Sequence, residues 1–262
     1  MNYPYFQEEL QQKGAAGLQG PVYLTDCCQA FIKDIELSET ASRIEGLKEA
    51  FPPKAELECH GLLDFKQIKN RIIFKLVNAK RNAEQLADMP HLPFLDLAIV
   101  FCIVLKMSPS GTISIPIHNE HLKLWNVDTE TLDTHARRNG LHILPPTLEA
   151  MASILKEQGA SVKDECDRNP TFVLSNEKVF WGAASLLYDG ILQTVGDLLH
   201  MNYFVLPSSI HETIIYPDGP DISTEELNET IQFANENIVD PPEILSDHAY
   251  YYDRKQGRLV IP

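Results

Sequence analysis

The feature that most constrains the fold is an apolar run, LPFLDLAIVFCIVL, at residues 92–105. A helix that spans a bilayer needs about 20 consecutive apolar residues, whereas this run is shorter and contains Asp96. The run is rich in β-branched and aromatic residues, and a Pro-Ser-Gly sequence that favours a turn follows it. We therefore predict a buried strand over residues 95–106.

The segment after this turn predicts the partner of that strand. Isoleucines alternate with other residues in GTISIPIHN (111–119), as expected for a strand with one apolar face, so the two segments should form a hairpin. Pro116 has no N–H to donate, so this strand should lie at a sheet edge or end early. Similar patterns predict strands over 21–26, 171–176, 179–188, 203–207 and 212–217, and a terminal hairpin from residue 249.

Helical periodicity is strongest over residues 64–88, where apolar residues recur at three- and four-residue steps and the remaining face is basic. Further helices are expected over 39–50, 119–125, 129–139, 147–158, 189–200 and 223–238. The prediction is an α+β fold with a mixed, mainly antiparallel sheet built from hairpins with flanking helices. Residues 1–262 should form a single domain, with a subdomain boundary most compatible with the polar connector 159–170.

Charge is distributed unevenly along the chain. The formal net charge is −15, from 22 Lys and Arg and 37 Asp and Glu. Residues 179–253 contain thirteen of the acids and neither Lys nor Arg. Such a chain repels nucleic acid and anionic membranes, so the expected partner is a basic protein. The acidic third could instead dock on the basic 64–88 segment, or form a solvated face.

Cysteine usage and the N-terminal sequence bear on the compartment. The five cysteines are odd in number and contain no CxxC pair, which suits reduced thiols. The sequence MNYPYFQEELQQKG lacks the basic start and apolar run of a signal peptide. We therefore expect a cytoplasmic protein.

The stretch VLPSSIHETIIYP (205–217) raises the question of catalysis, because Ser208, Ser209, His211 and Glu212 lie within five residues. A serine nucleophile usually sits on a sharp turn such as GxSxG, which is missing here, and His211 does not begin an HExxH motif. Residues two apart on a strand are roughly 7 Å apart, too far for an assured Ser–His hydrogen bond. The favoured interpretation is a tight connection between two strands, with these side chains satisfying backbone groups.

Two other groups are candidate binding residues. His118, Asn119 and His121 could begin a metal site, because histidines three apart share one face of a helix, but a third ligand such as His91, Glu120 or His211 would have to come from elsewhere. The alternative is an Asn119 N-cap flanked by polar histidines. Asn176 suits a hairpin turn before the next strand.

Longer segments carry a family resemblance. The motifs PHLPFLDLAIVF, SNEKVFWGAASLLY and LPSSIHE, in this order, resemble an uncharacterised domain-of-unknown-function family of anaerobic Gram-positive gut bacteria, over residues 21–262. The resemblance implies no established activity. It also implies that members are often carried by mobile genetic elements.

The leading functional hypothesis is a non-enzymatic binding or accessory protein with an acidic C-terminal third. No nucleotide-binding loop or zinc ribbon occurs in the sequence, and we predict no catalytic residue, metal or cofactor. One alternative is a hydrolase or metal-dependent enzyme centred on His211 with Ser208, Ser209 or Glu212. Another is an acidic mimic of nucleic acid.

Overall fold

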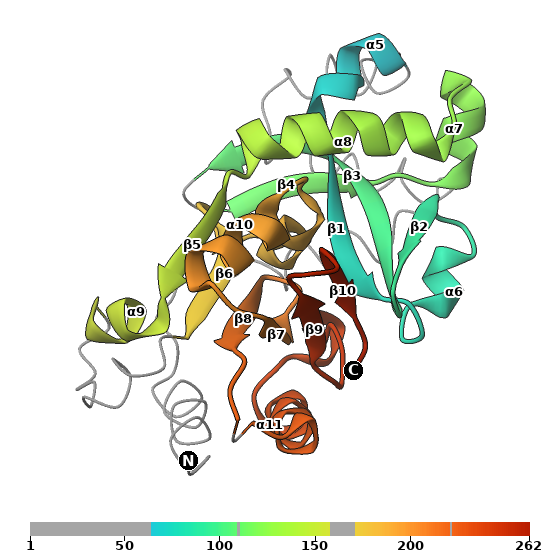
Figure 1. Ribbon diagram of the computed structural model, residues 1–262. Coiled ribbons are helices and arrows are strands. Elements are labelled where there is room, and N and C mark those ends of the chain that lie inside the picture. Colours follow the sequence, from blue (N-terminus) through green and yellow to red (C-terminus); the bar gives the residue numbers. More distant parts are fainter. Residues whose placement is uncertain (1–63, 109–110, 158–170, 221) are drawn as a thin grey trace.

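A computed structural model describes residues 64–108, 111–157, 171–220 and 222–262 (Figure 1). The elements expected over 21–26 and 39–50, and the connector 159–170, lie outside these residues. The described strands form a four-stranded and a six-stranded sheet, and every pairing between them is antiparallel. The predicted α+β fold is confirmed. Among the described helices, none is long and apolar enough to cross a membrane.

The four-stranded sheet is built around the apolar run. Its strands are β1 (Ile72–Asn78), β2 (His91–Phe94), β3 (Leu97–Ser108) and β4 (Gly111–Pro116). The strand β3 pairs with all three others. Its residues from Leu97 to Val104 are all buried, so layers of side chains cover both faces of this part of the strand. The predicted β3–β4 hairpin is confirmed, and β4 pairs only with β3, which places Pro116 at an edge as expected.

The prediction of one amphipathic helix over residues 64–88 was wrong. The segment contains two one-turn helices, α5 (Phe65–Ile68) and α6 (Ala83–Leu86), a 3-10 turn η1 (Lys69–Arg71), and the strand β1 between them. Ile72 and Ile73 are both buried although they point to opposite faces, which a strand covered on both sides allows. The apolar residues of this segment, which only Lys75 interrupts, fit the period of a helix as well as that of a strand buried on both faces, and the β-branched residues among them favour the strand. The expected basic helix face therefore does not exist.

The six-stranded sheet has the order β10-β9-β7-β8-β6-β5. Its strands are β5 (Pro146–Ala150), β6 (Phe172–Asn176), β7 (Tyr203–Ser209), β8 (Glu212–Pro217), β9 (Tyr250–Asp253) and β10 (Arg258–Val260). Tyr203 and Val205 face a core shared with the other sheet, whereas Phe204 and Leu206 face a second core. Because both faces are covered, the first four residues of β7, Tyr203 to Leu206, are all apolar. The strands predicted near 171, 203, 212 and 249 are confirmed.

Helices flank both sheets, some within the core that the sheets share and others on the opposite face of the six-stranded sheet (Figure 1). They are α7 (Asn119–Trp125), α8 (Thr129–Ile143), α9 (Met151–Glu157), α10 (Ile191–Leu199) and α11 (Thr224–Asn237), with the short 3-10 elements η3 (Gly182–Leu187) and η4 (Pro241–Glu243). The second core lies between α9, α11 and the six-stranded sheet. Ser223 caps α11 by accepting from the Glu226 N–H.

Three predicted elements differ from the structure in type or in extent. The expected strand 179–188 is the buried element η3, which is preceded by left-handed residues at Val179 and Trp181. Residues 146–150 form β5 instead of beginning the helix expected over 147–158. The helix α8 was expected to end at Asn139 but continues to Ile143. The Asn139 side chain donates to the carbonyls of Lys69 and Ile72 instead of ending the helix.

Candidate functional site

The strands β7 and β8 form a hairpin that turns at Ile210 and His211. The His211 N–H donates to Ser209 Oγ at 3.0 Å, and Ser208 Oγ donates across the hairpin to Glu212 Oε1 at 3.2 Å. The segment expected to be a tight connection is therefore a hairpin turn closed by its own side chains. These four candidate residues come together at the turn between the two central strands of the six-stranded sheet.

Each of the two ring nitrogens of His211 faces a polar group of the protein. The Trp181 N–H donates to Nδ1 at 3.2 Å, and because a backbone N–H can only donate, Nδ1 must be unprotonated. The proton of the neutral ring then lies on Nε2, which faces Glu243 Oε1 at 3.3 Å. His211 is 5% exposed. We call Ser175, Trp181, Gly182, His211 and Glu243 the His211 network.

The rest of this network closes the space around the turn. The His211 carbonyl accepts from Ser175 Oγ at 2.8 Å. Gly182 lies so close that a Cβ there would be 2.1 Å from Ser175 Oγ and 2.3 Å from the His211 carbonyl oxygen. Glu243 contributes its main chain as well, because its carbonyl accepts from Ile210 N–H at 2.9 Å. The network therefore locks η3, η4 and the hairpin together.

Asn176 lies at the other end of the loop that leads to Trp181. Its Oδ1 accepts from the N–H groups of Lys178 and Phe180, and its Nδ2 donates to the Phe180 carbonyl at 2.8 Å. The side chain forms the turn that its residue type suggested. By fixing this loop, Asn176 presents the Trp181 N–H to His211.

The second predicted group lies on the other sheet, at the start of α7. The N-cap is His118, one residue before the expected Asn119, because His118 N–H donates to His121 Nδ1 at 2.9 Å and completes a capping box. His118 Nδ1 faces Asp88 Oδ2 at 2.9 Å, and Asn119 Nδ2 donates to the Ala87 carbonyl. The His121 ring stacks on Trp125 with centroids 5.1 Å apart.

The electrostatics of this turn favour a neutral His121. Burial lowers the pKa of His121, and the neighbouring His118 lowers it further, while Glu120 and Asp88 act weakly in the opposite direction. A neutral ring can accept the capping hydrogen bond, which a protonated one cannot. Within the described residues, no three His, Cys, Asp or Glu side chains are grouped as metal ligands.

A third polar group escaped the sequence analysis. The Asp96 carboxylate accepts from Tyr250 OH at 2.8 Å and from Ser246 Oγ at 3.4 Å, and it faces His248 Nε2 at 3.1 Å. These bonds tie the segment before β9 to the turn between β2 and β3. The signal was the presence of Asp96 in an apolar run, which we used only to exclude a membrane helix.

A hollow opens at the other end of the β7–β8 hairpin. Its volume is about 790 Å³. The polar residues that line it include Asp197, His200, Asn202, Asp218, Arg254 and Lys255, and we call it the Arg254 hollow. These residues come from three separate segments of the chain, so sequence spacing could not group them. The one available signal was that Arg254 and Lys255 are the first bases after the acidic stretch.

Hydrogen bonds fix the wall of this hollow. Tyr251 OH donates to Asp218 Oδ2 at 2.7 Å and accepts from Asn202 Nδ2 at 2.7 Å. Asn202 Oδ1 accepts from Arg254 N–H at 3.0 Å. Burial raises the pKa of Tyr251, and its hydrogen bond to Asp218 raises it further, so the hydroxyl keeps its proton as a donor. The Arg254 guanidinium donates through Nε and Nη2 to Asp197 Oδ1.

The molecule is thus an α+β protein of two antiparallel sheets, with polar groups at the strand ends. The model of a family of unknown function, DUF5688, matches residues 11–254, and the chain belongs to this family. The resemblance to an uncharacterised family is confirmed at that level. No curated protein and no solved structure matches the chain.

Proposed function

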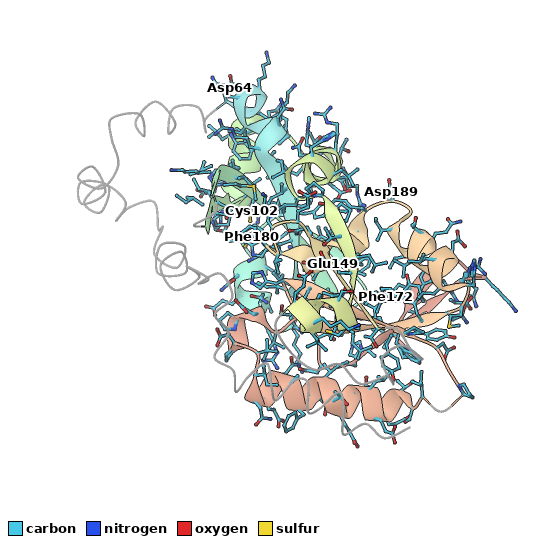
Figure 2. The ribbon with its side chains drawn as sticks, turned by 90° about the vertical axis from the view of Figure 1, so that its left-hand side faces the viewer. Asp64, Cys102, Glu149, Phe172, Phe180 and Asp189 are labelled. Atoms are coloured by element: carbon cyan, nitrogen blue, oxygen red, sulfur yellow. The ribbon has the colours of Figure 1, made fainter. Side chains whose placement is uncertain are left out.

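We propose that this chain is a non-enzymatic binding or accessory protein of the cytoplasm, and that its acidic C-terminal third contacts a basic protein. The observation that carries the proposal is the outer face of α11. Glu225, Glu226, Glu229 and Glu236 are exposed there, and none forms an ion pair within the described part of the chain. Figure 2 shows α11 along the lower side of the molecule, with side chains directed into solvent.

The glutamates stand on a rigid support. The opposite face of α11 is buried through Leu227, Thr230, Ile231 and Asn235. Asn235 Nδ2 also donates to the Ser246 carbonyl at 2.9 Å, which fixes the helix to the neighbouring segment. A fixed row of like charges produces a field that attracts a basic surface and orients it before contact.

The non-enzymatic part of the proposal is supported by the His211 network. A general base must reach the proton that it removes, at roughly 2.6–3.2 Å. Both ring nitrogens of His211 already face protein partners, and the residue as a whole is 5% exposed. The hydroxyls of Ser208 and Ser209 bond within the same hairpin. These contacts favour a structural role for the residues that suggested catalysis.

A defined basic probe tests the α11 surface. We expect the full chain to bind a fluorescent decalysine peptide, with an affinity that falls as salt rises. The variant E225Q/E226Q/E229Q/E236Q should bind on the order of tenfold more weakly. The matched control is E84Q/E130Q/E149Q/E157Q, which removes as many exposed carboxylates outside the acidic third. An equal loss in both variants would mean that net charge alone attracts the peptide, and would overturn the proposal.

A chemical label tests the hydrolase alternative. An activated serine reacts with a fluorophosphonate probe, and we expect no labelling of Ser208 or Ser209. Labelling that His211→Gln abolishes would overturn the non-enzymatic proposal in favour of a hydrolase. Competition between this chain and duplex DNA for one basic protein would instead favour an acidic mimic of nucleic acid.

A further inference from the structure

The Arg254 hollow has the features of a ligand site that is separate from the α11 surface. We propose that it binds a small zwitterion, an α-amino acid, with the carboxylate at Arg254 and Lys255 and the ammonium group at Asp218. The volume of about 790 Å³ is within the range of small-molecule sites, roughly 300–1,000 Å³. This inference does not depend on the binding of a basic protein.

Arg254 is held in place before any ligand arrives. Its aliphatic stem lies against Gly196 of α10, where an added Cβ would be 3.4 Å from Arg254 Cγ and 3.2 Å from Tyr252. Its Nε and Nη2 donate to Asp197 Oδ1 at 3.1 and 2.9 Å. These bonds occupy two of the five guanidinium N–H groups, and the others make no hydrogen bond to a described residue. A fixed guanidinium with unused donors suits a carboxylate.

Lys255 adds a second cation beside Arg254. Its backbone N–H bonds to Asp253, but its ammonium group forms no ion pair within the described ranges. Arg254 and Lys255 follow a stretch, residues 179–253, that contains neither Lys nor Arg. The positive charge of the acidic third is thus concentrated at the rim of this hollow.

The opposite side of the hollow suits an ammonium group. The Asp218 carboxylate uses Oδ2 to accept from Tyr251 OH, which fixes its orientation and leaves Oδ1 for a ligand. The helix α10 ends at the hollow, with His200 in the left-handed conformation at its C-cap. The carbonyl end of a helix carries partial negative charge and stabilises a nearby cation.

The balance of charges selects a zwitterion over a simple anion. Two acids, Asp197 and Asp218, and two bases, Arg254 and Lys255, line the hollow. A phosphate would meet the bases but would also be repelled by the carboxylates. An amino acid can place its carboxylate near the bases and its ammonium group near an acid, because both charged groups are bonded to the same carbon.

Titration calorimetry with the full chain tests the ligand class. Each of the twenty standard L-amino acids is titrated singly, and we expect at least one to bind saturably with a Kd below about 1 mM. The N-acetyl and the amide derivatives of that amino acid, which each lack one charge, should bind on the order of tenfold more weakly. Inorganic phosphate should not compete.

Variants test the location. Arg254→Gln and Asp218→Asn should each weaken amino-acid binding on the order of tenfold, because each removes a charge-assisted hydrogen bond. Arg258→Gln, at an exposed residue of the neighbouring strand, is the matched control and should bind as the wild type does. An unfolding midpoint for each variant shows that it is folded. The proposal fails if no amino acid binds, if Arg254→Gln binds normally, or if phosphate binds more tightly than every amino acid.

Discussion

The two ends of the β7–β8 hairpin present polar side chains in opposite ways. At the turn, the His211 network is closed, because the imidazole nitrogens face the Trp181 N–H and the Glu243 carboxylate, and Ser175 Oγ donates to the His211 carbonyl. At the other end, the Arg254 hollow is open, and its cations keep donors that the described part of the fold does not use. A buried polar group must be satisfied by the protein, whereas an exposed one can be satisfied by a ligand.

This contrast separates polar side chains that stabilise the fold from polar side chains that are available to bind a ligand. His211 and Arg254 both pair with a carboxylate, so the kind of partner does not distinguish their roles. Their side chains are 6% and 40% exposed, respectively, and this difference decides what each can do. We therefore expect substitutions at the turn to lower stability and substitutions in the hollow to change binding.

The largest loss of stability is expected from a substitution at Gly182, where the His211 network leaves no space for a side chain. A methyl group there would lie 2.1 Å from Ser175 Oγ and 2.3 Å from the His211 carbonyl oxygen, so backbone must move. Gly182→Ala should lower the free energy of unfolding by about 3 kcal/mol. The control is Gly219→Ala at the hollow, where the nearest atom would be 3.4 Å away and the loss should stay under about 1 kcal/mol.

Urea denaturation of both alanine variants gives the measurement. Similar unfolding midpoints for the two would show that the turn adapts, and would remove the distinction between a closed and an open end.

The next effect compares His211 with Arg254 directly. His211→Ala leaves the Trp181 N–H and the Glu243 carboxylate without their ring partner, and should cost about 2 to 3 kcal/mol of unfolding free energy. Arg254→Ala removes an exposed ion pair and should cost less than about 1 kcal/mol. Chemical denaturation measures both losses. A reversed order would contradict the assignment of structure to one end and binding to the other.

The sequence predicted the parts of this fold that local patterns determine. The turn chemistry after residue 108 and the alternating isoleucines were sufficient for the β3–β4 hairpin. The pattern was ambiguous over 64–88, because a strand buried on both faces and an amphipathic helix share apolar residues at three- and four-residue steps. The element η3 was missed because its path depends on the contact between Gly182 and a carbonyl far along the chain.

The candidate site residues show the same division. Asn176, Ser209 and His211 were singled out for their residue types, and the structural role that we favoured agrees with their contacts. The hollow could not be predicted, since Asp197, Asp218 and Arg254 meet only after the strands pair.

A smaller loss of stability is expected at Tyr251, whose hydroxyl joins two residues that line the hollow. Tyr251→Phe removes the hydroxyl that joins Asn202 to Asp218, and should cost about 1 kcal/mol of unfolding free energy. It should also weaken amino-acid binding, because Asp218 loses its fixed orientation. Tyr216→Phe is the control, since the Tyr216 hydroxyl makes no hydrogen bond to another described residue. Calorimetry and denaturation of both variants provide the comparison, and equal behaviour would show that Tyr251 does not orient Asp218.

The smallest effect concerns pH and the His118 turn, a closed polar group on the other sheet. Burial, and then the neighbouring His118, lower the pKa of His121 in the folded state. The unfolded chain therefore binds a proton more readily than the folded chain, and stability falls as pH drops below about 6.5, the ordinary histidine pKa. His121→Gln keeps an acceptor at the third position of the capping box but does not titrate in this range.

Comparing the free energy of unfolding at pH 7.5 and pH 5.5 isolates this contribution. The wild type should lose more stability between these two values than His121→Gln does. His135 contributes equally to both proteins, since burial also lowers its pKa and the substitution leaves it in place. A variant that loses as much stability as the wild type would show that His121 is not held neutral by its burial. The His118 turn would then resemble the open hollow more than the closed network.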